Sequence, residues 1–427
     1  MLDVKFIREN LELVKENIKK RNVNADAEKV VEISNRRNEL QHQSDIIRAK
    51  RNDNAQKMKA KLPDEERKIL IEEGRKFKED IAALEEEQKR LEEEYFIEAM
   101  KIPNLTHPLT PIGLTEEDSK EIRKIGKIPE FSFKPRDHTE LAQKLDIVDF
   151  EAGASVAGQK FYFLKNAGAL LELELVQYVI SLLTKKGFMP CLTPDIARAE
   201  ILKGIGFNPR GAETNIYSIA DSDLCLIATA EITIGGMYSN KIFNENELPM
   251  KVAGFSHCFR TEAGAAGQAT RGLYRVHQFS KVEMFVICKP EESDAFHETL
   301  REIEEEIYQS FGIPYRLLDI ATGDLGNPAY RKYDLEAWMP GRGEYGEITS
   351  TSNCTDFQAR RLNIKFKDAE GKNRYVHMLN GTAVAVPRVI IAILENFQRE
   401  DGTVAIPEVL QPFMGGMKII VKPDLKA

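Results

Sequence analysis

The chain has 427 residues, of which 42% are hydrophobic and 30% charged, and its formal net charge is −8. This length is typical of two or three domains with substantial cores. No run of eighteen apolar residues occurs, so we expect no membrane span. The N-terminal stretch MLDVKFIRENLELVKEN is acidic and amphipathic, unlike a signal or transit peptide, which favours a cytoplasmic protein.

Cysteine usage and charge limit the possible functions further. The cysteines are odd in number and far apart, without a CxxC pair or a histidine cluster beside them: Cys191, Cys225, Cys258, Cys288 and Cys354. This favours reduced, buried thiols and predicts neither a disulfide framework nor a zinc site. The negative net charge argues against indiscriminate nucleic-acid binding, although local basic patches decide such contacts.

The N-terminal hundred residues are predicted to be helical. Residues 1–20 indicate one short helix, because a helical stripe joins Phe6, Ile7, Leu11, Val14 and Ile18. Further along, apolar or small positions alternate steps of four and three, which predicts a coiled-coil seam: Leu70, Gly74, Phe77, Ile81, Leu84, Gln88, Leu91 and Tyr95. Pro63 can end one helix, and Asp64 can cap the next. We therefore expect an antiparallel helical hairpin over about 26–100, reaching roughly 50 Å.

Charge along this predicted arm is uneven. From Arg48 to Lys78 there are eleven lysines and arginines against six acids, whereas residues 79–98 are mainly acidic. A basic tip suits salt-sensitive contacts with a phosphate backbone. The alternative is a solvated coiled-coil surface. Because no compact domain needs such a projection to fold, we expect the arm to contact something distant.

The remainder of the chain is predicted to be an antiparallel α+β domain. Pro103, Pro108 and Pro111 mark a connection, so we place the boundary between residues 1–102 and 103–427. Helices are expected at 169–186, at 290–311 and directly after Arg388. Strands are expected at 252–260, 274–287, 313–320, 333–339, 346–350, 375–379 and 417–422. The absence of a βαβ rhythm and of GxGxxG argues against a Rossmann sheet.

The segment from Phe255 to Phe285 is the most informative stretch. It predicts two strands joined by a loop of glycines and alanines, which lets backbone approach a bulky polyanion. Arg260 closes the first strand, and Arg271 and Arg275 open the second. The planar arginine fork matches phosphate oxygens two at a time. On composition alone, a solvated surface hairpin is the favoured alternative.

Motif 2 of class II aminoacyl-tRNA synthetases resembles two stretches of this chain, FRTE at 259–262 and RVHQFSKVE at 275–283. The residues resemble the form of this motif found in the seryl-tRNA synthetase family. The resemblance implies that Arg260 holds the ATP α-phosphate, that Phe279 stacks on adenine and that the loop 263–272 faces the tRNA acceptor end. It also implies ATP contacts from Thr261, Glu262, Arg271 and Val276. The loop departs from the family in having Gln268-Ala269 where a charged pair is common.

Three side chains suggest an amino-acid pocket. The hydroxyl of Thr229 and the carboxylate of Glu231 can hold an ammonium group, although Thr229 is by itself more typical of a helix N-cap. Glu283 lies on an apolar strand, where it should face a cation or hydroxyl unless it is on the wet face. The resemblance implies that Thr229, Glu231 and Glu283, together with Arg260, bind serine.

The stretch from Glu344 to Asn353 is dense in carboxylate and hydroxyl oxygens, the ligands that Mg²⁺ requires. A hydroxyl-rich edge strand is the alternative. It resembles the family's E-I-S-S-x-S-N-C stretch, which implies ATP contacts from Glu347, Ile348, Thr349 and Ser350. On the same ground, Glu347 and Ser350 are the expected Mg²⁺ ligands.

The stretch from Asn380 to Arg388 resembles motif 3, which implies that Arg388 contacts the ATP γ-phosphate and is catalytic together with Arg260. Thr382 stands where the family usually has serine, against the substrate hydroxyl. Ala383 and Pro387 replace two usual glycines, and proline is tolerated only near the first turn of the following helix. These departures leave the shape of the serine pocket open.

Residues 169–194, a helix followed by a strand ending in Pro194, resemble motif 1, which implies a homodimer. With the arm and the tail Ile406–Leu410, the resemblance covers nearly the whole chain. It implies a class II antiparallel-sheet catalytic domain with a coiled-coil arm. The implied activity is the ATP-dependent attachment of L-serine to tRNA(Ser) through seryl-adenylate, and whether tRNA(Sec) is also charged stays open.

Three other functions were weighed. An enzyme that loads a carrier protein has no use for the arm. A non-catalytic tRNA-binding protein would not need the arginines and acids of the motifs. A purely structural coiled-coil protein does not account for the mixed globular sequence after residue 103.

Overall fold

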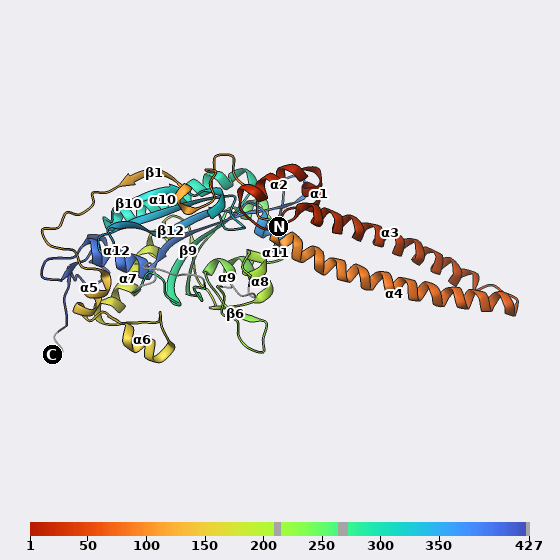
Figure 1. The fold of residues 1–427 in the computed structure, drawn as a ribbon, viewed down its shortest axis with the longest axis horizontal. Helices are drawn as coiled ribbons and strands as arrows, with labels where there is room; N and C mark the ends of the chain where they lie inside the picture. Colours follow the sequence, from red (N-terminus) through yellow and green to blue (C-terminus); the bar gives the residue numbers. More distant parts are fainter. Residues whose placement is uncertain (209–214, 264–271, 424–427) are drawn as a thin grey trace. The chain divides into compact units, whose positions relative to one another are not determined.

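The computed structural model describes residues 1–208, 215–263 and 272–423 (Figure 1). It divides into two units, Met1–Leu105 and Thr106–Ala427. Arg271 and most of the predicted loop 263–272 lie outside the described residues.

The N-terminal unit contains the predicted helical hairpin, formed by α3 (Ala27–Lys57) and α4 (Asp64–Lys101). The Asp26 side chain caps α3 by accepting a hydrogen bond from the Lys29 amide at 3.0 Å. Asp64 was expected to cap α4, but Pro63 occupies that position and Asp64 is the first helical residue. There its charge still favours the helix N-terminus through the helix dipole.

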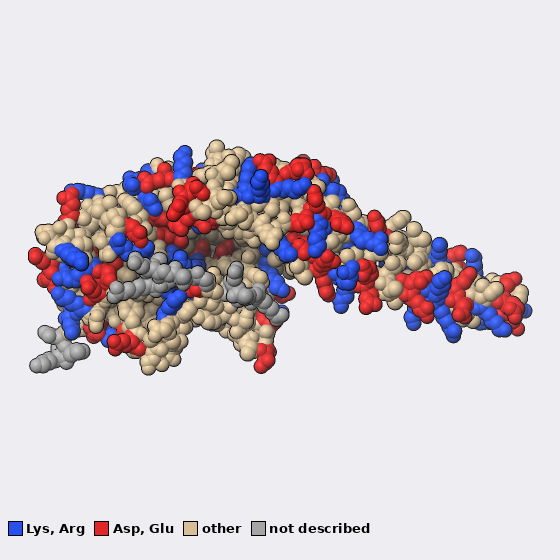
Figure 2. Space-filling view, in the orientation of Figure 1, with Lys and Arg blue, Asp and Glu red and all other residues tan. Residues whose placement is uncertain are grey.

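The seam between α3 and α4 is mixed in character. Ile81 and Leu91 are buried along it, as the heptad spacing predicts, and Ile33 and Leu40 of α3 are buried as well. Gln88 donates to Gln41 across the seam at 2.7 Å. Surface pairs such as Arg48–Glu85 add little stability. Figure 2 shows that basic side chains lie among acidic ones along the arm, so its tip carries both signs.

The prediction of one helix over residues 1–20 is wrong, because two helices occur, α1 (Val4–Glu9) and α2 (Leu11–Lys20). Asn10 interrupts them, and its side-chain amide donates to the Phe6 carbonyl at 3.1 Å. Asparagine competes in this way with the backbone for helical hydrogen bonds. Ile7, Val14 and Ile18 remain buried, so the predicted stripe still packs inward.

The larger unit is built on an eight-stranded sheet in the order β1-β10-β11-β12-β15-β9-β8-β4 (Figure 1). All neighbours are antiparallel except β4 and β8. The strands are β1 (Lys120–Ile125), β4 (Met189–Leu192), β8 (Met250–Phe259), β9 (Gln278–Cys288), β10 (Tyr315–Asp319), β11 (Arg331–Met339), β12 (Glu344–Asn353) and β15 (His377–Ala385). The α+β prediction is confirmed, with β9 starting at Gln278 rather than at Tyr274.

The other elements surround this sheet. The helices are α5 (His138–Leu145), α6 (Phe150–Ala157), α7 (Asn166–Lys185), α8 (Ala199–Ile205), α9 (Ala230–Met237), α10 (Ser293–Phe311), α11 (Phe357–Leu362) and α12 (Val386–Asn396). Short strands are β2 (Val148–Asp149), β3 (Phe163–Leu164), β5 (Ile196–Arg198), β6 (Leu224–Leu226), β7 (Ile242–Asn244), β13 (Lys365–Lys367), β14 (Asn373–Tyr375), β16 (Val404–Ala405) and β17 (Ile419–Ile420).

The two faces of the sheet are covered differently. On one side, which we call the helix face, Met284 and Val286 pack with α7, α10 and α12. On the other side, which we call the site face, Phe285 and Ile287 pack with α8, α9 and α11. Lys281 and Glu283 continue the site-face alternation of β9, so polar groups follow apolar ones along one strand.

A register shift between β11 and β12 determines which β12 side chains share the site face. Leu335 pairs with Thr349 and Glu336 with Glu347, so Ile348 is an extra residue. Such a bulge reverses the alternation of side chains beyond it. Glu347 and Ser350 are three residues apart, yet the bulge places them on the same face.

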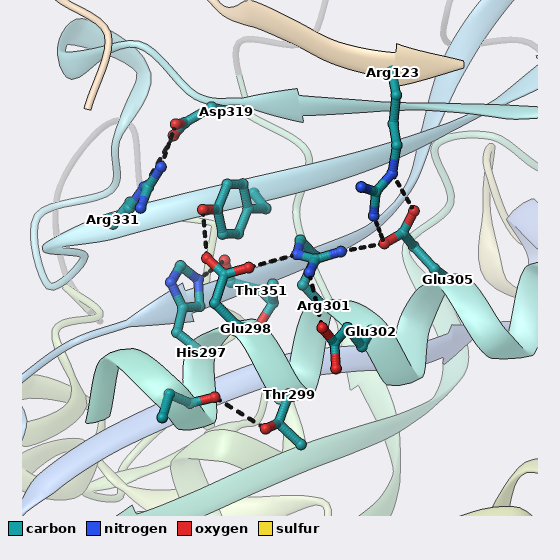
Figure 3. Close-up of polar contacts among 12 residues, drawn as sticks. Arg123, His297, Glu298, Thr299, Arg301, Glu302, Glu305, Asp319, Arg331 and Thr351 are labelled. Carbon is teal, nitrogen blue, oxygen red and sulfur yellow. Dashed lines mark hydrogen bonds and ion pairs between the residues drawn. The ribbon is translucent and has the colours of Figure 1, made fainter. Parts of the chain in front are cut away.

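A polar network ties α10 to the edge of the sheet on the helix face (Figure 3). The Arg123 Nε of β1 donates to Glu305 at 3.0 Å, and Arg301 contacts both Glu305 and Glu298. Arg331 pairs with Asp319 at 2.7 Å between β11 and β10. These pairs satisfy buried charges and hold β1 and α10 against the sheet.

Within the described ranges, α7 is the one helix whose length and apolar composition would suffice to cross a membrane. One side of α7 packs into the core through Leu171, Leu175, Val179 and Leu183. A core helix of a globular domain meets the same criterion, so this is weak support for a membrane segment.

Candidate active site

A pocket with about 490 Å³ of empty space, including the open solvent at its mouth, brings the two predicted catalytic arginines together. It is lined by the end of β8, the start of β9, the middle of β12 and the β15–α12 junction. The predicted residues on its wall are Arg260, Glu262, Val276, Phe279, Glu347, Ile348, Thr349, Thr382 and Arg388. Segments far apart in the sequence therefore meet around one cavity.

Arg260 is positioned by the end of the β8–β9 pairing. Its backbone amide donates to the His277 carbonyl at 3.0 Å, and its Nε lies 3.4 Å from the Ala228 carbonyl. The guanidinium carbon lies 5.2 Å from the centre of the Phe279 ring. This cation–π arrangement holds a positive charge beside a flat apolar surface.

Arg388 lies in the first turn of α12, where Pro387 is tolerated as expected. Its Nη1 contacts both Oε1 and the backbone carbonyl of Glu347 at 3.0 Å. Its guanidinium stacks 4.8 Å from the Tyr274 ring. Burial opposes ionisation of Glu347, but the charges of Arg388, Lys332 and Arg260 hold the pKa of that carboxyl at about 2.

Glu283 is a buried acid with two partners. Lys281, two residues earlier on the same face of β9, forms an ion pair with it, and the Thr382 hydroxyl lies 3.4 Å from Glu283 Oε2. The two side chains of the ion pair are only 6% and 2% exposed. The expectation that this acid faces a cation or a hydroxyl is confirmed.

Glu231 and Thr229 lie at the start of α9. Thr229 is the helix N-cap, accepting from the Glu231 amide at 3.3 Å, so the interpretation from local sequence is confirmed. Glu231 Oε1 accepts from Gln358 at 2.6 Å and from Asn380 at 2.8 Å. Burial, followed by the charge of Glu283, raises the pKa of Glu231 to about 7.

Several predicted residues do not line the pocket itself. Thr229, Glu231, Glu283, Thr261 and Ser350 are absent from its wall, and Arg271 lies outside the described residues. Lys281 and Tyr274 line it without having been predicted. The spacing of Lys281 from Glu283 was a usable signal, because residues two apart on a strand share a face.

The predicted metal ligands, Glu347 and Ser350, suit a divalent ion bound to a nucleotide better than an ion held by protein alone. In the part of the chain that the structure describes, no three histidine, cysteine or acidic side chains gather as a protein-only metal site needs. Mg²⁺ at a nucleotide, however, usually takes one or two carboxylates with phosphate and water. Glu347 and Ser350 share the site face, and Asp334, paired with Ser350 across the ladder, has a buried Oδ1 without a hydrogen-bond partner. The donor set therefore fits such an ion.

Comparison with known proteins identifies the family. Residues 1–106 match the seryl-tRNA synthetase N-terminal domain, and residues 217–397 match the class II tRNA synthetase core domain (G, H, P, S and T). A serine--tRNA ligase of Treponema denticola is 57% identical over 417 residues, covering 97% of this chain and 99% of that protein. The chain belongs to the seryl-tRNA synthetase family. The serine--tRNA ligase of Rubrobacter xylanophilus is 54% identical, covering 97% of this chain and 98% of that protein.

The fold of this seryl-tRNA synthetase family member agrees with a solved relative. A crystal structure of seryl-tRNA synthetase from Pyrococcus horikoshii complexed with ATP has a TM-score of 0.90 and 40% sequence identity. The match covers 99% of this chain and 100% of that chain. The predicted family and the class II fold with its helical arm are thus confirmed.

The Lys281–Glu283 pair predicts a specific pattern of stability. Lys281→Met leaves a buried carboxylate without its cation, and we expect it to lower the free energy of unfolding by about 3–5 kcal/mol. Adding Glu283→Leu removes the uncompensated charge and should recover most of that loss. Urea unfolding followed by the fluorescence of Trp338, the single tryptophan, reports on this unit.

Lys289→Met serves as the control, because Lys289 pairs with Glu245 at 3.5 Å near the surface. We expect it to change stability by less than about 1 kcal/mol. If Lys281→Met and Lys289→Met lowered the free energy of unfolding equally, burial would not account for the contribution of the Lys281–Glu283 pair to stability.

Proposed function

We propose that the chain catalyses the ATP-dependent attachment of L-serine to tRNA(Ser). The serine carboxylate attacks the α-phosphorus of ATP, an oxygen–phosphorus bond forms, and pyrophosphate leaves. The acyl group of seryl-adenylate then passes to the terminal ribose of the tRNA, and AMP is released. The observation that carries this proposal is the presence of Arg260 and Arg388 on one pocket, in a chain of this family.

The nucleotide is held mainly by charge and stacking. Arg260 neutralises the α-phosphate, where negative charge gathers in the transition state. Phe279 offers its ring to adenine, while Thr261, Glu262, Val276, Ile348, Thr349 and Arg271 complete the nucleotide contacts. No protein nucleophile is needed. Alignment of the two substrates therefore supplies much of the catalysis and can lower the activation free energy by on the order of 7–11 kcal/mol.

Arg388 and Glu347 exchange partners when the nucleotide binds. In the free protein each neutralises the other at 3.0 Å. The γ-phosphate replaces Glu347 as the partner of Arg388, which releases the Glu347 carboxylate toward a cation. Glu347 and Ser350 would hold Mg²⁺, which would supply charge neutralisation to the triphosphate. In the free protein the pKa of Glu347 is lowered to about 2, so the carboxylate is already ionised before the nucleotide binds.

Serine is recognised at both of its polar ends. Glu231 accepts the substrate ammonium beside Thr229, and Glu283 with Thr382 contacts the substrate hydroxyl. Lys281, through its ion pair, orients Glu283. When alanine enters, these buried groups lose their partner, a penalty that can reach roughly 10⁴-fold. Threonine is refused by shape.

The arm and the surface of α7 suggest the macromolecular partners. We assign residues 1–102, with the hairpin at about 26–100, to binding tRNA(Ser), and residues 103–427 to catalysis, with the motif 2 loop reaching the acceptor end. Leu173 of α7 and Leu192 of β4 are 64% and 79% exposed, which suits burial in a homodimer. Such an enzyme of translation acts in the cytoplasm, without a membrane.

Arg260→Ala should abolish adenylate formation while the protein still folds, because the α-phosphate loses its counter-charge. ATP–pyrophosphate exchange with serine measures this step directly. Arg342→Ala is a matched control, since Arg342 also stacks on Tyr274, at 4.7 Å, without lining the pocket. Exchange near the wild-type rate in Arg260→Ala would remove Arg260 from the mechanism.

Serine binding should weaken as pH falls through the pKa of Glu231. This pKa is raised to about 7 in the free protein, so Glu231 is ionised at pH 8 and protonated at pH 6. Between these values the ionised fraction falls about tenfold, and the KM for serine should rise by about that factor. Serine's own ammonium stays charged over this range.

ATP–pyrophosphate exchange from pH 8 to pH 6 gives the KM for serine, and the KM for ATP serves as the internal control. In Glu231→Gln the KM for serine should be high at every pH and nearly independent of it. A flat profile in the wild type would contradict the assignment of Glu231 to the substrate ammonium.

Trimming residues 36–92 should leave serine activation intact but remove tRNA charging. The cut lies where α3 and α4 are in contact, since Arg37 pairs with Glu92 beside the ends to be joined. A short Gly-Ser linker can therefore close the stem. Pyrophosphate exchange and tRNA aminoacylation, measured on the same preparation, separate the two activities. Normal charging by the trimmed protein would mean that the arm serves another partner.

A further inference from the structure

An ion pair on β11 lies beside the two expected metal ligands and has no role in the mechanism above. Lys332 Nζ contacts Asp334 Oδ2 at 2.9 Å, and the two side chains are 18% and 8% exposed. The pair repeats the spacing of Lys281 and Glu283, with the lysine two residues before the acid.

The strand register places this pair at the metal subsite. Asp334 lies opposite Ser350, and Glu336 lies opposite Glu347. Glu336 is already held by an ion pair with Arg316. Asp334 therefore differs from Glu336 in having one buried carboxylate oxygen, Oδ1, outside its ion pair.

The free oxygen of Asp334 requires a physical explanation. Asp334 Oδ1 is buried and lacks a hydrogen-bond partner among the described residues. A buried acceptor left without a partner loses its hydration without compensation, so such groups usually have a functional reason, or water or an ion as partner. Divalent cations bound to nucleotides accept such an oxygen directly or through one of their waters.

Lys332 has the properties of a tether for this carboxylate. Its ammonium nitrogen contacts Asp334 Oδ2 at 2.9 Å, and Asp334 Oδ1 lies outside this ion pair. Fixing one oxygen of a carboxylate orients the other, as outer partners do in metal sites.

We propose that Asp334 is a further oxygen donor of the divalent-ion subsite, alongside Glu347 and Ser350, and that Lys332 is its positioning residue. This inference rests on the proposed binding of Mg²⁺ with ATP and adds two residues to it. Lys332 does not contact the substrate or the ion.

The test is metal binding to the full chain with Mn²⁺ as probe and α,β-methylene-ATP as a nucleotide that cannot be activated. Free Mn²⁺ is measured by electron paramagnetic resonance as the protein is titrated. The wild type should bind Mn²⁺ only when the nucleotide is present, and Asp334→Asn should weaken that binding about 10–100-fold.

The double variant Lys332→Met with Asp334→Asn distinguishes the loss of the Asp334 carboxylate oxygen from a change in the net charge of the site. It keeps the net charge of the site and avoids leaving a buried ammonium unpaired, so it also replaces Asp334→Asn if that variant fails to fold. We expect its Mn²⁺ affinity to stay as weak as that of the single variant.

Asp319→Asn is the matched control, because it also removes the acid of a largely buried ion pair, in this case with Arg331 on the neighbouring strand at 2.7 Å. Asp319 pairs with Tyr333, so it lies on the helix face, away from the ion subsite. Its Mn²⁺ affinity should remain within about twofold of the wild type.

Wild-type affinity in both Asp334 variants, or a return to wild-type affinity in the double variant, would overturn the inference. Failure of the wild type itself to bind Mn²⁺, with Glu347→Ala behaving identically, would instead remove the metal from the proposed function. The two failures are therefore distinguishable in one set of titrations.

Discussion

The ion pair between Arg388 and Glu347 makes the pocket possible before any nucleotide is bound. Arg260, Arg388 and Lys281 line one partly enclosed cavity, and like charges at that proximity would repel strongly in a medium of low dielectric constant. Glu347 and Glu283 balance them and hold the side chains in fixed positions. The free-energy cost of placing these cations close together is offset when the protein folds. The positive groups are therefore already in place when the triphosphate binds.

The position of each acid depends on strand register rather than on strand identity. The extra residue at Ile348 turns Glu347 toward the same face as Ser350. A second shift, between Thr382 and Val384, occurs where β15 passes Glu283. Near it the Thr349 hydroxyl donates to the Thr382 carbonyl, joining β12 to β15 beyond the last pair of their ladder. The register shifts thus interrupt the regular ladder at the site, while the Thr349 hydroxyl supplies a hydrogen bond between β12 and β15 next to the interruption.

The sequence was sufficient for features that rest on local patterns. Heptad spacing predicted α4, Pro63 predicted the turn of the hairpin, and the motif resemblance named Arg260 and Arg388. It was not sufficient where contacts link distant strands. Asp334 and Ser350 face each other only because of a register that no local pattern encodes, and Asn10 divides a helix through one side-chain hydrogen bond.

Two lysine–acid pairs show a shared way of placing a counter-charge beside a carboxylate inside a protein. Lys281 precedes Glu283 on β9, and Lys332 precedes Asp334 on β11, each by two residues and each on the site face. An isolated buried carboxylate would take up a proton, because desolvation disfavours its charge. A lysine two positions away on the same strand supplies the counter-charge without help from tertiary contacts, since the pleat alone brings the two side chains together. In the proposed mechanism, one pair is assigned to the substrate hydroxyl and the other to the divalent ion, so both assignments use the same local arrangement of lysine and acid.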